Sequence, residues 1–406
     1  MNQIRILTVA GLLMALTASV FAASAESPVH MSNRLRLGYD DNVYQVDKDG
    51  STGLDKTDSI RIVEELEMLV NLNMPRAYLG LRYRPSVLWY ADREPEDTDF
   101  LHDLDLNFSY TFSPLLSLSL NDTLRASQLP ELQDENYIVR EDDDNMYNSA
   151  MATLSYNLRP ETRLDLSGRL ITLVYSSDSE AKNNGDYYSA VGGLTLRQQL
   201  ASRTTLLGDL RYQTLVYNEA DAAHNRDAET IFAGLGAEQT FSPQMMGSLR
   251  AGVENSMYDN EAYDDNTAPY GEVSMTFLPT PATRLTTAAS YSIYESDVAN
   301  YLSQDRLYLS LSLAHDFTAK LSFYASTAYS LNAYDADYAL ASDPATPALG
   351  DADETSFLLS ARLAYRVNRI NWIETGVQYV ALDSDIETRE SYDRTRFDLG
   401  WKIQLF

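Results

Sequence analysis

Histidine is the side chain that most often moves protons near neutral pH, and the chain has four of them. His30 precedes the first expected strand and His224 lies in an acidic segment, whereas His102 and His315 belong to two different expected strands. No Gly-x-Ser-x-Gly motif accompanies them, and the chain has no Cys. We therefore expect no catalytic site and no cofactor, and we keep a lipid- or peptide-cleaving enzyme as a minor alternative.

Acidic residues occur in runs that could present oxygen ligands to a hard cation such as Ca²⁺. The runs are Glu94-Pro95-Glu96-Asp97, Glu141-Asp142-Asp143-Asp144 and Asp264-Asp265-Asn266. None of them has the D-x-[DN]-x-[DN]-G spacing of a dedicated calcium loop. We predict no metal site and interpret the runs as solvated loops, and whether they bind Ca²⁺ in another way is left open.

Charged residues also recur at every second position of otherwise apolar stretches, as Arg82 and Arg84 do, and as Asp209 and Arg211 do. Residues two apart in a strand share one face. Opposed charges on such a face can filter charged solutes, as rings of charge do in channels. The alternative is a wall with local ion pairs that only stiffens the structure, and the choice depends on the elements that carry these residues.

Those elements are strands, because apolar and polar residues alternate with a period of two. In the stretch 303–318, Leu309 and Leu311 share one face, while Tyr308 and Ser310 share the other. Eighteen such stretches can be counted, and tight turns such as Ser113-Pro114 alternate strictly with long polar connections.

This alternation of short and long connections predicts the fold class: an all-β, transmembrane outer-membrane antiparallel β-barrel of about 18 strands, with short periplasmic turns and long extracellular loops. A soluble sandwich uses shorter strands. A propeller has a similar repeat length but packs four strands into each repeat. Only a closed barrel leaves no unpaired strand edge in lipid.

In such a barrel the leucine faces point into lipid and the charged faces point into the lumen. The lumen-lining candidates are Arg36, Arg82, Arg84, Arg169, Asp209, Arg211 and Arg362. Glu64 is an exception, because an acid on the lipid face is destabilising. A β-bulge or a position near the rim would explain it.

Ten tyrosines lie near the loop ends of the expected strands, where a girdle of amphipathic rings at the headgroup level is expected. They are Tyr44, Tyr90, Tyr147, Tyr175, Tyr187, Tyr217, Tyr258, Tyr270, Tyr294 and Tyr334.

The two ends of the chain indicate export to the bacterial outer membrane. Residues 1–25 combine an early positive charge, an apolar run and small residues at Ala23-Ser24-Ala25, which predicts a cleaved signal peptide followed by a barrel over residues 26–406. The C-terminal residues resemble the assembly signal of outer-membrane proteins, which implies the barrel assembly machinery as a partner. That signal comprises Asp398, Gly400, Ile403, Leu405 and Phe406, with Phe406 one position out of the apolar series.

The stretch "RLRLGYDDNVYQ" resembles the start of the putative β-barrel porins, a family often associated with exopolysaccharide gene clusters, and Gly38-Tyr39-Asp40-Asp41-Asn42 is its sharpest part. The recurring S-P-x-x-x-L and R-P-x-x-x-L turns extend the likeness over most of the chain. The resemblance implies an outer-membrane barrel with a part in moving or anchoring polysaccharide, and it implies no catalytic residues.

The resulting function hypothesis is a porin-like channel for passive diffusion of small polar solutes. The alternative is a barrel assisting exopolysaccharide export or surface anchoring, with Tyr217 and Tyr308 as candidates for a sugar-binding path; a non-conducting adhesive barrel is a third hypothesis. Outer-membrane lipid and lipopolysaccharide are expected partners, and a homo-oligomer is left open. A formal net charge of −28 argues against nucleic acid.

Overall fold

The computed structural model describes residues 28–47, 55–94, 97–127, 132–134, 137–138, 145–175, 186–218, 225–260, 264–296, 301–335, 350–386 and 389–405. The expected signal peptide, His224 and Phe406 lie outside these ranges. Across them there is no helix long and apolar enough to cross a membrane.

Eighteen of the strands form one sheet, and two short strands, β6 and β7, pair separately. Their bounds are β1 Val29–Asp40, β2 Ser59–Asn73, β3 Ala77–Tyr90, β4 Thr98–Ser113, β5 Leu116–Ser127, β6 Leu132–Asp134, β7 Tyr137–Ile138, β8 Asn145–Arg159, β9 Thr162–Tyr175, β10 Tyr187–Ala201, β11 Thr204–Tyr217, β12 Ala228–Ser242, β13 Met245–Tyr258, β14 Asn266–Thr280, β15 Thr283–Glu295, β16 Ser303–Thr318, β17 Leu321–Tyr334, β18 Ala352–Arg366, β19 Asn371–Ser384 and β20 Tyr392–Gln404.

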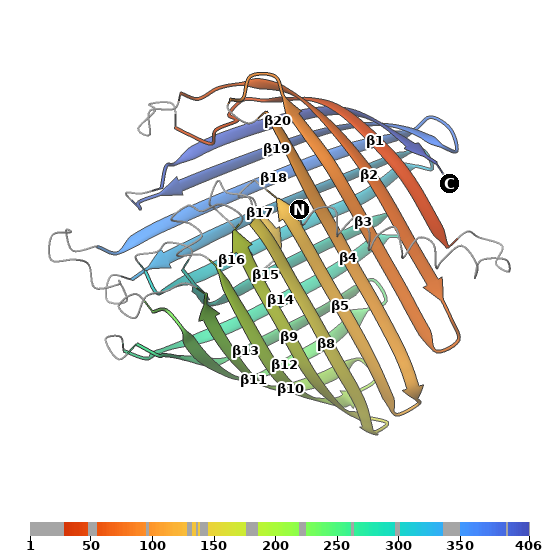
Figure 1. Cartoon of the computed structure of the whole chain (residues 1–406). Helices are drawn as coiled ribbons and strands as arrows, with labels where there is room; N and C mark the ends of the chain where they lie inside the picture. Colours follow the sequence, from red (N-terminus) through yellow and green to blue (C-terminus); the bar gives the residue numbers. More distant parts are fainter. Residues whose placement is uncertain are drawn as a thin grey trace.

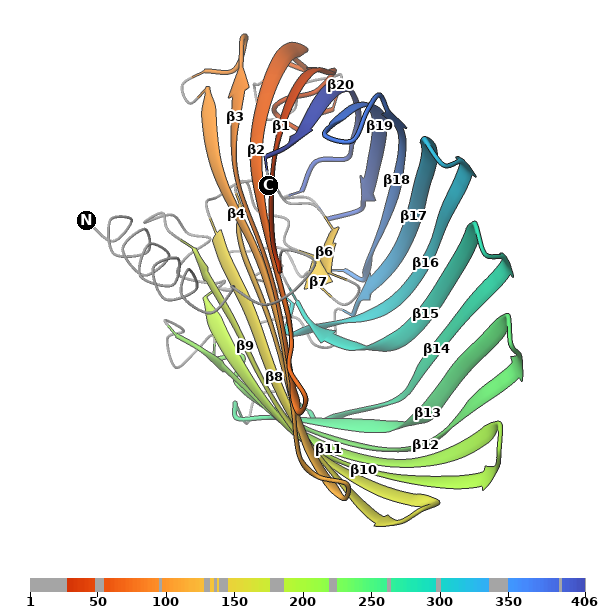
Figure 2. The same ribbon diagram turned by 90° about the vertical axis from the view of Figure 1, so that its right-hand side faces the viewer.

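The sheet closes into a barrel, because β1 pairs antiparallel with both β2 and β20. Every other barrel strand pairs with its neighbours in chain order, with β5 next to β8. Figure 1 shows this ring of tilted strands, and Figure 2 shows β1 to β5, β8 and β9 as one wall with β12 to β20 curving opposite them. The predicted architecture of 18 antiparallel strands is confirmed.

The leucine faces point outward. In β16, Leu309 and Leu311 are 41% and 42% exposed, whereas Tyr308, next to Leu309, is 8% exposed. Leu210, Leu235 and Leu399 are exposed in the same way on β11, β12 and β20. A continuous apolar exterior of this kind belongs in hydrocarbon rather than in water.

The expected tyrosine girdle at the loop ends is wrong for most of its members. Those that turn inward and are buried are Tyr90, Tyr147, Tyr175, Tyr187, Tyr217, Tyr270 and Tyr334. Several pack against Leu173 and Leu215 in one cluster. These tyrosines lie an even number of residues from the inward charged or polar positions of their strands, so they share the inward face. The prediction used only their position near the strand end and therefore placed them wrongly.

Other aromatic residues occupy the outward positions near the strand ends. Near the long loops these include Tyr39, Trp89 and Tyr188, and near the tight turns Tyr156, Phe241, Phe317, Tyr365 and Trp401. These rings have the placement that an interfacial aromatic belt requires.

No bulge lies beside Glu64, since Glu64 pairs with Val87 and Met68 pairs with Tyr83 in the same register. Glu64 is the sixth residue of β2 and lies exposed on the outer face. Asn33 Nδ2 donates a 2.9 Å hydrogen bond to Glu64 Oε1. A neighbouring outward amide, and not a change of register, therefore solvates this acid.

The assignment of the two faces predicts a sharp difference between neighbouring positions of β16. Leu309→Arg places a charge in hydrocarbon and should lower the free energy of unfolding by about 2–4 kcal/mol. Ser310→Arg, its matched control, points into the lumen beside Ala288 and Ala328 and should change stability by less than about 1 kcal/mol. Urea unfolding in lipid vesicles, followed by tryptophan fluorescence, measures both. Equal losses would contradict the assigned faces.

Candidate functional site

A hollow of about 450 Å³ opens on the inner wall where β1 to β5 face β17 to β20. Its lining comes from strands far apart in the sequence, and its charged members are Arg36, Arg61, Glu65, Arg84, Asp103, Arg125, Arg362, Glu374, Arg396 and Asp398. The period of two places these side chains on the lumen side of their strands. The curvature of the barrel then brings the two groups of strands around one space.

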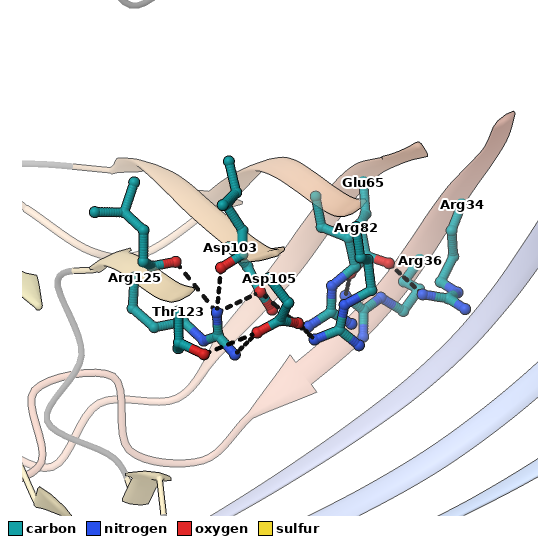
Figure 3. A network of polar contacts seen from close by, with 11 residues as sticks. Arg34, Arg36, Glu65, Arg82, Asp103, Asp105, Thr123 and Arg125 are labelled. Atoms are coloured by element: carbon teal, nitrogen blue, oxygen red, sulfur yellow. Dashed lines mark hydrogen bonds and ion pairs between the residues drawn. The ribbon is translucent and has the colours of Figure 1, made fainter. Parts of the chain in front are cut away.

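An ion-pair network covers one side of this hollow (Figure 3). Arg82 pairs with Asp105 and Arg84 pairs with Asp103, each across the β3–β4 register. Arg125 on β5 joins the two pairs, with its Nη1 2.7 Å from Asp103 and its Nη2 3.0 Å from Asp105. The guanidinium groups are thus held in place by carboxylates on the adjacent strand, which is the stiffened wall that the sequence left as an alternative.

A second group of ion pairs crosses the seam between β1 and β20. Arg61 on β2 donates from Nη2 to both carboxylate oxygens of Asp398 on β20 at 2.9 Å. Gly38 of β1 lies between them in the same row, pairing with Arg61 on one side and Asp398 on the other. Because glycine has no side chain, the ion pair can pass directly over β1.

A second ion pair passes over a glycine at Gly400, two residues beyond Asp398 on β20. Arg34 Nε lies 2.8 Å from Glu374 on β19, so this ion pair passes over β20. Gly400 of β20 pairs with both Arg36 and Glu374, and a Cβ at Gly400 would lie 2.8 Å from Arg36 Cγ. Arg34 and Arg36 also pair with Glu65 on β2.

Above these rows, a buried latch ties the first strand to the last. Arg394 of β20 pairs with Asp40 at the end of β1, with Nη2 2.6 Å from Oδ2, and both side chains are almost fully buried. The backbone N–H of Thr395 donates to Asp41, and Asn42 Nδ2 donates to the backbone oxygens of Val46 and Asp393. The motif that carried the family resemblance therefore holds the closing edge of the barrel.

A second hollow, of about 330 Å³, lies on the inner wall of β8 to β15. Arg197 lies 2.7 Å from Asp165 and also pairs with Glu238. Arg211 lies 2.9 Å from Asp209 and is stacked between the rings of Phe232 and Tyr270, 4.7 and 4.9 Å from their centroids.

All seven lumen-lining candidates fall on these walls, but the structure does not bring them into one site. Arg36, Arg84 and Arg362 line the larger hollow, and Arg169, Asp209 and Arg211 line the smaller one. Arg82 lines a third recess near the turn end of β2 to β5. Five of them, Arg36, Arg82, Arg84, Asp209 and Arg211, form ion pairs with a residue of the same or a neighbouring strand.

Two candidates differ from the rest in having no carboxylate partner within the described residues. Arg362 of β18 is exposed inside the larger hollow. Arg169 of β9 donates only to hydroxyl groups, to Ser149 at 2.8 Å and Tyr147 at 3.5 Å. No carboxylate of the described residues neutralises their charge.

The sequence missed several residues of these networks, namely Arg34, Glu65, Asp103, Glu272, Glu374 and Arg394. Each has the inward parity of its strand, so the alternation rule could have found them. Their partners could not be found, because Arg61 and Asp398 are separated by 337 positions in the chain.

Of the assembly-signal candidates, Asp398 and Gly400 contribute to the seam, while Ile403 pairs with Asn33 and Asn371 near the turn end of the barrel. Leu405 is exposed and donates its backbone N–H to Met31. The role of these residues as a signal stays a prediction.

Three histidines lie on strands in the described ranges. His30, expected to precede the first strand, is the second residue of β1. His102 and His315 have the parity of the outward Phe100 and Phe317 on β4 and β16. His102 Nδ1 is 2.9 Å from the Tyr83 hydroxyl, and His315 Nδ1 is 2.9 Å from Thr283 Oγ1. His102 is among the residues that border the larger hollow, and His315 is not.

Comparison with known proteins identifies a protein family that matches about half of the chain. A family model described as putative beta-barrel porin 2 matches residues 204–405. Residues 204–405, about half of the chain, belong to this porin family. The family expected from the sequence is thereby confirmed, and the match covers β11 to β20, which include half of the larger hollow and one side of the seam. No curated protein matches the chain.

The solved structures that match the chain include three with low sequence identity. The crystal structure of OccAB3 from Acinetobacter baumannii has a TM-score of 0.45 and 14% identity, covering 93% of this chain and 99% of that one. OccAB2 from the same organism gives 0.47 and 10%, covering 93% and 98%. OccK2 (OpdF) from Pseudomonas aeruginosa, in complex with glucuronate, gives 0.44 and 10%, also covering 93% and 98%. At such low identities the likeness does not extend to function.

The glycine at the seam is expected to be essential for closing the barrel. A Cβ at Gly38 would lie 2.5 Å from Asp398 Oδ1 and 2.7 Å from Phe397 O, so Gly38→Val should destabilise the barrel by about 1–3 kcal/mol through overpacking. At Gly208 a Cβ meets nothing within 4 Å, so Gly208→Val is the matched control. The folded fraction on semi-native gels and the refolding rate in vesicles measure the effect. A Gly38→Val protein that closes as fast as its control would refute this role.

The Asp40–Arg394 latch makes a second prediction. Asp40→Asn leaves a buried guanidinium without its carboxylate and should lower the free energy of unfolding by about 3–5 kcal/mol. Asp58→Asn removes an exposed carboxylate that accepts a hydrogen bond from Tyr39 and should change stability by less than about 1 kcal/mol. Urea titration in vesicles compares them. Wild-type stability for Asp40→Asn would show that the latch does not hold the seam.

Proposed function

We propose that this protein is an outer-membrane porin through which small polar solutes pass by passive diffusion. The observation that carries the proposal is the closed ring of 18 strands with a charged and polar inner wall and an apolar outer wall. Barrels of about eight strands are filled by their own side chains, whereas 16 to 18 strands leave an aqueous channel. Membership of a porin family supports the same function.

Small solutes are favoured because loop residues pack onto the inner wall at the loop end of the barrel. Val43 contacts the cluster of Val63, Leu88 and Tyr90, which line β2 and β3. Tyr301 and Ile386 pack in the same way against Tyr334 and Ala352. These loops reduce the free cross-section at the extracellular mouth.

The inner wall offers little to an exported polysaccharide. Tyr217 and Tyr308, the two candidates for a sugar-binding path, are each 8% exposed. Tyr217 lies within the buried tyrosine cluster at the loop end. Rings packed in this way cannot stack on sugar residues in the lumen, so the proposal does not extend to polysaccharide export.

The proposed setting is the bacterial outer membrane, with lipopolysaccharide and phospholipid against the apolar wall and the barrel assembly machinery as the folding partner. The outward leucines and the aromatic residues near both strand ends support this setting.

Planar-bilayer recording tests the proposed function directly. Purified, refolded protein should produce stepwise ion conductance at neutral pH, and heat-denatured protein at the same concentration should produce none. Vesicles containing the protein should swell in small neutral sugars and not in dextran. Folded protein that inserts into vesicles without conducting ions would overturn the porin function.

A further inference from the structure

The larger and the smaller hollow each have an excess of positive charge, whereas the chain as a whole is acidic. The whole sequence has a formal net charge of −28. The larger hollow is lined by six arginines and four carboxylates, an excess of two positive charges. The smaller hollow is lined by four arginines and three carboxylates, namely Arg169, Arg197, Arg211, Arg250, Asp165, Asp209 and Glu272.

Arg362 contributes to the positive excess of the larger hollow. Arg61, Arg84 and Arg125 are each held by an aspartate, and Arg36 shares Glu65 with Arg34. Arg362 has no carboxylate partner in the described part of the chain, and it is near enough to Arg36 for the two like charges to interact unfavourably. Glu65, one acid whose charge interacts with that of Arg362, is already shared by two other arginines.

An anion from the solvent would offset the repulsion between the exposed Arg362 and the partly buried Arg36. At the reduced dielectric constant of a narrow lumen, two unit charges interact several times more strongly than in bulk water. A guanidinium group presents parallel N–H donors that match an oxyanion such as carboxylate or phosphate. The ion pairs of the wall hold the neighbouring arginine side chains in fixed positions. These side chains therefore neither fold over a bound anion nor move away from it.

We propose that the hollow around Arg362, Arg36 and Arg84 is a binding subsite for small oxyanions, and that it makes the channel selective for anions. The ligand class is a small carboxylate or phosphate, which crosses the larger hollow by exchanging water for the guanidinium of Arg362. The inference rests on the proposed porin function and specifies its solutes.

Two measurements on the same bilayer test the subsite. The reversal potential in a potassium chloride gradient should show a chloride-over-potassium permeability ratio above one. Sodium succinate and inorganic phosphate, added in separate experiments, should each reduce the chloride current reversibly, and their relative potency reports which oxyanion the subsite prefers.

Substitutions of Arg362 separate the effect of its charge on ion selectivity from its direct contact with a bound oxyanion. Arg362→Gln should lower the chloride-over-potassium ratio and weaken block by the better oxyanion about tenfold, as expected for the loss of a charge-assisted contact. Arg362→Lys retains the positive charge but lacks the parallel N–H donors of a guanidinium group. It should therefore keep the chloride-over-potassium permeability ratio and still weaken block by the oxyanion. Lys320→Gln, in an exposed tight turn outside the hollow, is the matched control and should change neither.

The outcomes distinguish the two proposals. Folded protein without conductance would overturn the porin function, and the subsite with it. A conducting channel that prefers potassium, or that neither oxyanion blocks, would overturn the subsite and leave the porin function standing. Block that persists unchanged in Arg362→Gln would also overturn it, provided that semi-native gels show the variant to be folded.

Discussion

A bilayer core offers no hydrogen-bond partner for backbone N–H and C=O groups, and each unsatisfied group in hydrocarbon is destabilising by several kcal/mol. A sheet in lipid must therefore have no free edge. In this protein the requirement is met at one place, where β1 pairs with β20 from Ser32 and Gln404 to Asp40 and Arg396. Every other pairing joins strands that are neighbours along the chain, so this long-range contact decides whether the barrel exists.

The seam explains why so much of the charge on the inner wall gathers near the two ends of the chain. Loop closure over nearly the whole sequence is entropically unfavourable, and a single ladder of backbone hydrogen bonds would be its only support. Ion pairs that pass over Gly38 and Gly400 connect strands on both sides of the seam, and the Asp40–Arg394 latch secures its loop end. Buried and partly buried pairs of this kind add little net stability, but each of them forms only when the strands at the seam have the correct register. The larger hollow is thus a consequence of closure, since the residues that secure the seam are those that line it.

The period-two pattern predicted the strands, their number and the outward direction of the leucines, because the pleat makes each of these a local property. It also indicated which arginines face the lumen, as for Arg36 and Arg362. It could not indicate which walls approach each other, because that depends on barrel curvature and on contacts between the chain ends. The tyrosines show a different failure. Position near a strand end suggested an interface, whereas parity, which decides direction, placed Tyr90 and Tyr147 inside.

The acidic composition of the chain does not determine the field in the lumen. Charges on the loops act through water, where screening at physiological salt reduces them over a distance of about 8 Å. Arg362 acts on a solute confined beside it, with low-dielectric walls that focus its field. A small local excess of guanidinium groups can therefore outweigh a much larger number of distant carboxylates. The acids at the mouth would then affect how often anions reach the channel, while the arginines of the inner wall would affect which ions cross it.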